Sequence, residues 1–378
     1  MNNLSLNNKN NISFKGYDVR PLKGLYVQGF CKPDELKIFS ELKSIAKQEK
    51  FNLVFNQNNT KLSKNIDKQQ LQDFDKTLSI WGQDNKAFLI NKKKKILLCN
   101  SKEKTPPQDK EISDFSVIAK QYAPRGGNYF IGQNKKGEKW LLINSMSITD
   151  NQSFKQFGDT PTRKHLTELF EVKNKNIYTL NEFSNDLDEI VRPIKYPYIL
   201  VNDSNLSLKN LEKMKEKFPD KVETYDYIKN KLDVKIRQEN NIPQINSAED
   251  TVNKLKKYGF KPIKIAGSYC EDINFLNAIA FENKKGNISY ITNSTKHTSP
   301  ELEYLEELFK NDLKSKIKNV DNIYFISGGK KENTPNKSTE NDLFSLVSDR
   351  GLPTQNNIMS IFANRHGGIH CMCAEIPE

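Results

Sequence analysis

The sequence predicts an α/β fold in a single domain. Short apolar segments of strand length alternate with longer segments that carry apolar residues at helical spacing. No Pro/Gly/Ser-rich linker divides the chain. A strand–helix unit recurs several times without exact repeats, which is typical of a degenerate repeat architecture. We therefore expect a disordered, Asn-rich tail over 1–14 and one domain over 15–378.

The predicted elements follow in order. Residues 24–29 are apolar enough for a buried strand, Pro33 begins an amphipathic helix, and 51–55 is the next strand. Ser247 and Asp250 fit the capping-box pattern of a helix start. Further strands are predicted at 77–82, 86–90, 95–99, 129–132, 139–144, 197–201, 261–265, 275–281, 287–292 and 323–326. Further helices are predicted at 161–171, 207–218, 225–237, 248–258 and 300–317, and polar surface loops at 101–113 and 328–342, the second of them mobile.

The charge balance bears on partners. With 59 Lys and Arg against 47 Asp and Glu, the chain carries a net charge of +12. This excess permits contact with nucleic acid, but its lysines are spread along the chain instead of being clustered. The run Lys92–Lys95 has no interleaved aromatic residues on which bases could stack, so it fits a solvated turn. We expect no nucleic-acid partner.

The chain start and the cysteines bear on location. The first residues lack the basic and apolar regions of a secretory signal, and no run approaches the roughly 18 apolar residues of a membrane helix. The five cysteines are odd in number and lack paired spacing, which argues against a disulfide framework. We therefore expect a cytoplasmic protein with free thiols and no membrane partner.

Two short motifs could suggest a bound group. Cys371 and Cys373 form a C-x-C pair without a second ligand pair, which is weak evidence for zinc. Gly126-Gly127-Asn128 lacks the lysine and hydroxyl residue of a phosphate loop. We expect neither a cofactor nor a metal.

The C-terminal segment concentrates reactive residue types. Arg365-His366-Gly367-Gly368-Ile369-His370-Cys371 contains two of the four histidines of the chain. Cationic neighbours would lower the thiol pKa of Cys371 from its free value of about 8.5, which favours a thiolate nucleophile. The alternative is a buried cysteine at the end of a C-terminal strand. The clustering of rare polar residues favours the nucleophile.

Carboxylates are the partners that a guanidinium substrate would need, because they accept its paired N–H groups. Asp84 ends the segment Trp81-Gly-Gln-Asp84 at a predicted strand end. Asp186 and Asp188 lie two residues apart, so on an extended segment they would face the same side. Taken singly, Asp84 also fits a turn, and the pair also fits a solvated loop.

Together these segments resemble the guanidine-modifying enzymes, the pentein superfamily of agmatine, arginine and peptidyl-arginine deiminases and amidinotransferases. The tail 367–371 looks like agmatine deiminase, whereas 365–367 and 83–84 look more like peptidyl-arginine deiminase. The resemblance covers about residues 20 to 377. The resemblance rests on four motifs in the order of the family: Trp81-Gly-Gln-Asp84, Arg125-Gly-Gly-Asn128, Asp186-Leu-Asp188 and Gly368-Ile-His-Cys371. It also rests on Asn274-Phe-Leu-Asn277, which resembles a strand that lines the family's cavity.

The resemblance implies a pentein fold, five ββαβ-type modules in a pseudo-fivefold propeller around a polar cavity. It implies that Cys371 attacks the guanidinium carbon and forms an amidino-thioether, while Asp84 and Asp188 hold the guanidinium nitrogens. The residues expected to bind substrate or to shape the surroundings of the cysteine are Trp81, Arg125, Asn128, Arg365, His366 and His370.

Two positions depart from the family pattern. The histidine of the family's His-x-Asp motif, which transfers the proton, matches Asp186 here, and His165 lies too far away in a predicted helix to replace it. Asp186 is the hypothetical acid/base, if crowding with Asp84 and Asp188 raises its pKa. Arg125 stands where several members carry an acid, so it would suit a substrate carboxylate or backbone carbonyls, which agmatine lacks. An exposed turn is the alternative for Arg125.

The leading expectation is a deiminase that converts a guanidino group to a ureido group and ammonia, acting on arginine, peptidyl-arginine or agmatine-type substrates. Without a general base the rate would fall by about 10²–10⁴-fold. The second expectation is therefore a catalytically impaired pentein that binds a guanidino ligand or a protein partner. Amidino transfer through the same cysteine is the third. The sequence leaves the oligomeric state open.

Overall fold

In the computed structural model, most of the described elements lie close to their predicted positions, but the strands at 116–119, 177–180, 191–195, 268–270 and 373–377 were not predicted. The described residues are 22–27, 33–55, 86–91, 94–99, 116–119, 126–148, 162–181, 186–242, 246–270, 273–294, 299–326 and 369–377. The predicted tail 1–14, the strand 77–82 and the loops 101–113 and 328–342 lie outside them.

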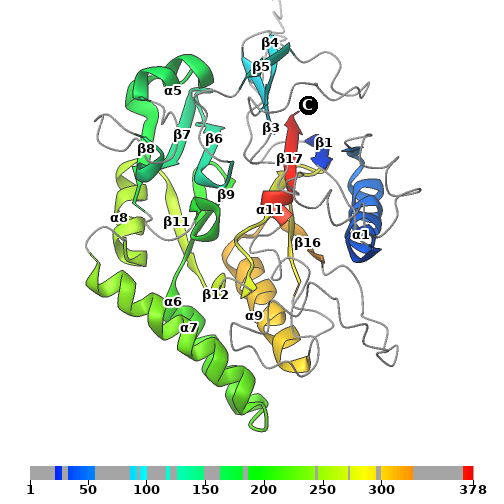
Figure 1. The fold of residues 1–378 in the computed structure, drawn as a ribbon, viewed down its shortest axis with the longest axis vertical. Helices are drawn as coiled ribbons and strands as arrows, with labels where there is room; N and C mark the ends of the chain where they lie inside the picture. Colours follow the sequence, from blue (N-terminus) through cyan, green and yellow to red (C-terminus); the bar gives the residue numbers. More distant parts are fainter. Residues whose placement is uncertain are drawn as a thin grey trace, which may run out of the picture.

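Five three-stranded sheets share one pattern in the described part of the chain (Figure 1). In each sheet the middle strand pairs antiparallel with one neighbour and parallel with the other. The strand orders are β17 (Cys373–Pro377), β1 (Leu22–Val27), β2 (Asn52–Phe55); β3 (Lys86–Asn91), β4 (Lys94–Cys99), β5 (Ser116–Ala119); β6 (Tyr129–Gln133), β7 (Lys139–Asn144), β8 (Ile177–Leu180); β9 (Val191–Lys195), β10 (Tyr198–Asn202), β11 (Lys261–Ile265); and β14 (Ile279–Glu282), β15 (Ile288–Asn293), β16 (Val320–Ile326).

Helices make the crossovers that parallel strands require, because a tight turn can only reverse the chain. α1 (Pro33–Glu49) joins β1 to β2, and α5 (Arg163–Phe170) lies between β7 and β8. α9 (Pro300–Lys316) joins β15 to β16. The crossover from β10 to β11 contains three helices, α6 (Ser204–Lys217), α7 (Val222–Asn241) and α8 (Ala248–Lys257).

The local signals explain several boundaries. The predicted capping box is confirmed, since the Ser247 hydroxyl accepts from the Asp250 N–H and the Asp250 carboxylate accepts from the Ser247 N–H at the start of α8. Pro300 occupies the first turn of α9, where its missing N–H costs nothing. None of the described helices is long and apolar enough to cross a membrane.

Two predicted strands are wrong in part. The predicted strand 275–281 is interrupted, because 275–278 form an irregular link between β13 (Ile273–Asn274) and β14. Tyr290 and Thr292 of β15 hold this link, each with a side-chain hydroxyl that donates to the Phe275 carbonyl at 2.8 Å. The short β12 (Ser268–Cys270) pairs with β13 in a two-stranded sheet.

The second correction concerns the C-terminus. The alternative considered for Cys371, the end of a C-terminal strand, is wrong: Cys371 lies in a short helical turn, α11 (Ile369–Met372), and the strand β17 begins only at Cys373. β17 then pairs antiparallel with β1, from Val27 opposite Cys373 to Leu22 opposite Pro377.

Buried polar contacts, in addition to apolar packing, join helices and sheets that are distant in sequence. Glu49, the last residue of α1, is almost fully buried. One of its oxygens, Oε1, accepts from Ser289 Oγ at 2.8 Å, Asn322 Nδ2 at 2.8 Å and Tyr324 OH at 2.6 Å. This carboxylate therefore fastens the first helix to β15 and β16, elements more than two hundred residues away in sequence.

Candidate active site

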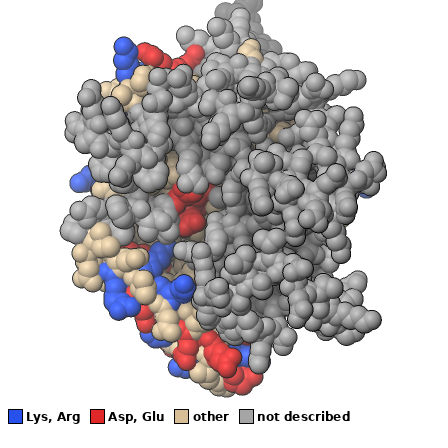
Figure 2. Space-filling view, viewed as in Figure 1, with Lys and Arg blue, Asp and Glu red and all other residues tan. Residues whose placement is uncertain are grey.

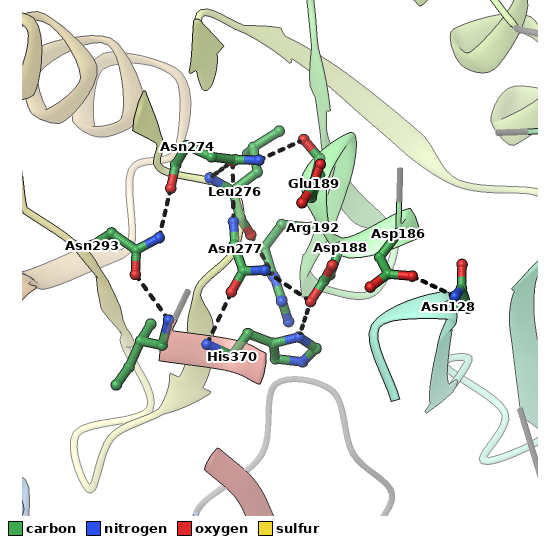
Figure 3. A network of polar contacts seen from close by, with 11 residues as sticks. Asn128, Asp186, Asp188, Glu189, Arg192, Asn274, Leu276, Asn277, Asn293 and His370 are labelled. Atoms are coloured by element: carbon green, nitrogen blue, oxygen red, sulfur yellow. Dashed lines mark hydrogen bonds and ion pairs between the residues drawn. The ribbon is translucent and has the colours of Figure 1, made fainter. Parts of the chain in front are cut away.

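The candidate site lies where α11 meets three irregular segments (Figure 3). These segments are the 3₁₀ turn η2 (Gly126–Asn128), the 3₁₀ turn η6 (Leu187–Glu189) and the link 275–278 with Asn274 at the end of β13. α11 contacts η2 and β15, and η2 contacts η6. The site is thus built at strand ends and turns, where side chains can converge without belonging to one sheet face.

Asp188 is the buried acid of the site, with 0% of its surface exposed. His370 Nδ1 lies 2.7 Å from its Oδ2, and Asn277 Nδ2 donates to the same oxygen at 3.1 Å. The His370 side chain is also buried. Since His370 immediately precedes Cys371, this hydrogen bond ties the carboxylate to the turn that carries the candidate nucleophile.

The His370 ring is neutral at ordinary pH. Burial, and secondarily the positive charge of Arg192, hold the pKa of His370 well below its usual value of 6.5. A neutral imidazole beside an ionised carboxylate donates its single N–H to it, so Nδ1 carries the proton and Nε2 is left as the acceptor. This arrangement orients both groups.

Arg192 lies behind the same site, with 1% of its surface exposed. Its Nε donates to the Leu276 carbonyl at 3.2 Å, and its guanidinium carbon lies 4.7 Å from the centre of the Phe130 ring. The Phe130 ring in turn lies 5.7 Å from the His370 ring. The cation is therefore held by an aromatic face and a backbone oxygen.

Two asparagines hold the backbone of α11. Asn293 Oδ1 accepts from the Ile369 N–H at 2.8 Å, and Asn277 Oδ1 accepts from the His370 N–H at 3.1 Å. Asn293 is itself fixed, because its Nδ2 donates to the Asn274 carbonyl at 2.9 Å. The first two N–H groups of a helical turn have no partner within the turn, and these amides satisfy them.

Asp186 has a different partner from Asp188. Its Oδ1 accepts from Asn128 Nδ2 at 2.5 Å, and Asn128 Oδ1 accepts from Asn144 Nδ2 at 3.0 Å. Gly127 allows this approach, since a Cβ there would lie 2.9 Å from the Cβ and the Oδ2 of Asp186. The expected extended segment is therefore wrong: Asp186 caps η6 and Asp188 lies within it, so the two carboxylates have separate partners.

The structure brings together four of the predicted residues: Asn128, Asp186, Asp188 and His370. The backbone of Cys371 lies in α11, directly after His370. His165 is confirmed as a helix residue, since its side chain completes the cap of α5 with Thr162. Five predicted residues lie outside the described ranges: Trp81, Asp84, Arg125, Arg365 and His366.

Sequence reasoning missed the role of three residues in this network. Arg192 lies between apolar residues, Val191 on one side and Pro193 and Ile194 on the other, and this setting indicates a buried charge. Asn277 was noticed only as part of a resembling strand, and Asn293 carried no signal, because an asparagine at a strand end is ordinary. Among the described residues, no three His, Cys, Asp or Glu side chains gather to hold a metal ion.

Comparisons with known proteins show the fold. No protein-family model and no curated protein matches the sequence. The structure is similar to Campylobacter jejuni agmatine deiminase, with a TM-score of 0.51 at 13% identity, covering 97% of this chain and 96% of that one. It is also similar to a structural-genomics protein provisionally named agmatine deiminase, with a TM-score of 0.50 at 10% identity, covering 96% and 95%.

A weaker likeness is to ArgZ, a cyanobacterial arginine dihydrolase, with a TM-score of 0.40 at 11% identity, covering 94% of this chain and 39% of that one. The first two likenesses show that this chain has a mixed α/β fold similar to that of agmatine deiminase over nearly its whole length. This agrees with the fold relationship expected from the motifs.

Proposed function

We propose that the protein binds a guanidino group beside Cys371 and hydrolyses it to a ureido group and ammonia. One observation carries the proposal. The buried Asp188 carboxylate is hydrogen-bonded to His370, the residue next to Cys371, within a fold similar to agmatine deiminase. A fixed carboxylate beside a cysteine supplies the two things that guanidinium hydrolysis needs, a clamp for the cation and a nucleophile.

The reaction proceeds in two halves. The Cys371 thiolate adds to the guanidinium carbon, and the bond from that carbon to one nitrogen breaks as ammonia leaves with an added proton. Water then adds to the same carbon, the carbon–sulfur bond breaks, and the thiolate is restored as the ureido product departs. Asp188 orients the cation in both halves, and Asp84 is proposed as the second clamp.

The proposed reaction also needs a group that transfers protons, and Asp186 is the candidate for this role. Asn128 fixes the Asp186 carboxylate by donating to one of its oxygens. Asp186 is half-buried, unlike Asp188, so water can reach its neighbourhood. We keep Asp186 as the group that would protonate the leaving amine and activate water.

The five repeated sheets support a fivefold arrangement. We propose that they form the blades of a pentein propeller, and that residues 15–378 make one domain. In support, β17 of the first sheet contacts β3 of the second, and β9 contacts β14 of the next sheet along the chain. A ring of this kind would put the strand ends that bear Asp188 and Cys371 around one central cavity.

A second candidate function is favoured by a specific observation. The Asp186 carboxylate is bonded to Asn128, and in the sequence resemblance Asp186 takes the place of the proton-transferring histidine. A protein that binds a guanidino ligand or a protein partner without turnover would keep Asp188 and lose that histidine. Amidino transfer would use the same cysteine with an amine as the acceptor in place of water.

The test is ureido-product formation from arginine, agmatine and an arginyl peptide, together with mass spectrometry of Cys371 after treatment with chloroacetamidine, a guanidinium-like alkylating agent. Turnover that vanishes in Cys371→Ala supports the deiminase. Labelling of Cys371 without turnover supports the binder, and product that forms only with an added amine supports transfer. The absence of both labelling and turnover would refute a guanidino site.

The preferred substrate is a separate part of the proposal. Arg125 lies outside the described residues, and its proposed partner is a carboxylate or a backbone carbonyl of the substrate. We therefore propose arginine, another guanidino acid or a peptidyl arginine in preference to agmatine. The same assay decides this, because agmatine differs from arginine only in lacking the carboxylate.

A further inference from the structure

Asn277 contacts both Asp188 and the turn that carries Cys371. Its side chain is buried, with Nδ2 donating to Asp188 Oδ2 at 3.1 Å and Oδ1 accepting from the His370 N–H at 3.1 Å. One planar amide therefore joins the acid on η6 to the turn that carries Cys371 (Figure 3).

The orientation of this amide is determined by its partners. A flipped amide would place its NH₂ group against the His370 N–H and its oxygen against the Asp188 carboxylate, so both contacts would become repulsive. The backbone is held too, because the Asn277 N–H donates to Asn274 Oδ1 at 3.3 Å and Arg192 Nε donates to the neighbouring Leu276 carbonyl. Asn277 is thus a rigid connector.

Asn293 provides a matched comparison. It holds the same turn one residue earlier, with Oδ1 accepting from the Ile369 N–H at 2.8 Å. Its Nδ2, however, donates to the backbone carbonyl of Asn274 and not to an acid. The two asparagines therefore share the contact with α11 and differ in the contact with Asp188.

We propose that Asn277 is a positioning residue that sets the separation and direction between Asp188 and Cys371. This inference rests on the proposed function, in which Asp188 holds the guanidinium that Cys371 attacks. The acid and the cysteine are on elements far apart in the chain, so their relative placement depends on side-chain links of this kind. A misplacement of about 1 Å can cost about a hundredfold in rate, which gives such a link a large effect.

The experiment compares Asn277→Ala with Asn293→Ala, using two alkylating agents and following Cys371 by peptide mass spectrometry. Chloroacetamidine is a planar cation that needs the clamp, whereas iodoacetamide is neutral and reports the thiolate alone. Both variants lose one bond to the backbone of α11, but only Asn277→Ala loses the link to Asp188. We expect the ratio of the chloroacetamidine rate to the iodoacetamide rate to fall about tenfold to a hundredfold more in Asn277→Ala than in Asn293→Ala.

The pH profile of iodoacetamide labelling should be the same in both variants, since neither substitution changes a charge. Equal rate ratios in the two variants, in a protein whose wild-type form prefers chloroacetamidine, would overturn the role of Asn277 and leave the proposed function intact. Absence of that preference in the wild type would instead overturn the guanidino site and this inference together. If the alanine variants do not unfold cooperatively, Asn277→Ser and Asn293→Ser replace them, with the same outcomes.

Discussion

At the scale of single residues, the proposed function rests on the hydrogen bond between Asp188 and His370. A carboxylate buried to this extent is stable only if hydrogen bonds compensate for its lost hydration. His370 and Asn277 supply two of them, both to Oδ2. In the proposed function, this carboxylate would also orient the guanidinium cation of the substrate.

Asp188→Asn removes this charge while keeping the size of the side chain. We expect chloroacetamidine labelling of Cys371 to slow by about tenfold or more, because a hydrogen bond to a charged group contributes about 1.5–3 kcal/mol. Labelling by iodoacetamide should change far less. Asp186→Asn is the matched control, and an equal effect of the two substitutions would argue against Asp188 as the principal clamp.

The lowered pKa of His370 predicts a loss of stability in acid. Because the folded state resists protonation of His370, the unfolded state binds more protons once the pH falls below 6.5, and the free energy of unfolding decreases. The decrease is up to about 1.4 kcal/mol per pH unit for one proton. Urea titrations at pH 7.0 and 5.5 should show this slope in the wild type and a smaller slope in His370→Asn.

Asn293→Ala provides the control for that measurement, since it weakens the support of α11 without removing a titratable group, and it should keep the acid slope of the wild type. A slope unchanged by His370→Asn would mean that another group is responsible for the acid sensitivity.

At the scale of elements, Glu49 shows how one side chain joins a helix to a distant sheet. Glu49→Ala leaves the donors Ser289, Asn322 and Tyr324 without their acceptor. A buried unpaired donor costs about 1–3 kcal/mol, and of the three only Ser289 is buried while the other two are half-buried, so we expect the free energy of unfolding to fall by about 2 kcal/mol or more. Glu49→Gln keeps an acceptor oxygen and should cost clearly less. Urea unfolding of both variants checks this, and equal losses would show that charge, not hydrogen bonding, matters.

Lys139 has a similar role at the end of α5. Its Nζ donates to the Phe170 carbonyl at 2.8 Å, and burial lowers its pKa from 10.5 to about 8, with Glu171 opposing the shift. The folded state loses this proton before the unfolded state does, so the free energy of unfolding should rise as the pH increases from about 8 towards 10.5. The comparison is wild type against Lys139→Met at pH 7.5 and 9.5, and a rise of equal size in both would contradict it.

At the scale of the whole molecule, the surface shows no single-sign stripe on the part of the face that Figure 2 describes. Lys and Arg side chains are interspersed with Asp and Glu over the lower left, where α6 and α7 lie in Figure 1. Ion pairs such as Lys229 with Asp233, at 2.6 Å, reflect the same mixing. On the described part of this face, charges of both signs are therefore mixed (Figure 2).

Because the sheets are repeated, we expect that removal of one strand destabilises its own sheet and leaves other sheets folded. Deleting 369–377 removes β17 from the first sheet and leaves β1 with one exposed edge. Hydrogen exchange followed by mass spectrometry should show faster exchange in β1 and β2, while the sheets around β7, β10 and β15 keep most of their protection. Full-length Cys371→Ala is the control, and a uniform loss of protection would show that the sheets unfold as one unit.

Much of the fold could be predicted because its signals are local. The strands at 139–144 and 261–265 and the capped helix starting after Ser247 depend on apolar spacing and caps, and they occur where expected. The interruption at 275–278 could not be predicted, because it depends on hydroxyl groups from β15.

The sequence indicated residues of the candidate site but not which of them are hydrogen-bonded to one another. Asp188 and His370 were both chosen as candidates, yet their hydrogen bond joins positions 182 residues apart, and no local pattern encodes such a contact. The same holds for the amides of Asn277 and Asn293, which act only through the turn they support. Long-range side-chain links are what a single sequence does not display.

The pairing of β17 with β1 also has a consequence for the order of events during biosynthesis. The two strands are separated by about 350 residues, so a nascent chain on the ribosome has a first sheet that lacks one of its strands until translation has passed residue 377. Cys371 emerges with that same strand. A chain interrupted before residue 371 would therefore carry neither the finished sheet nor this thiol, and the proposed site could form only after β17 had been made.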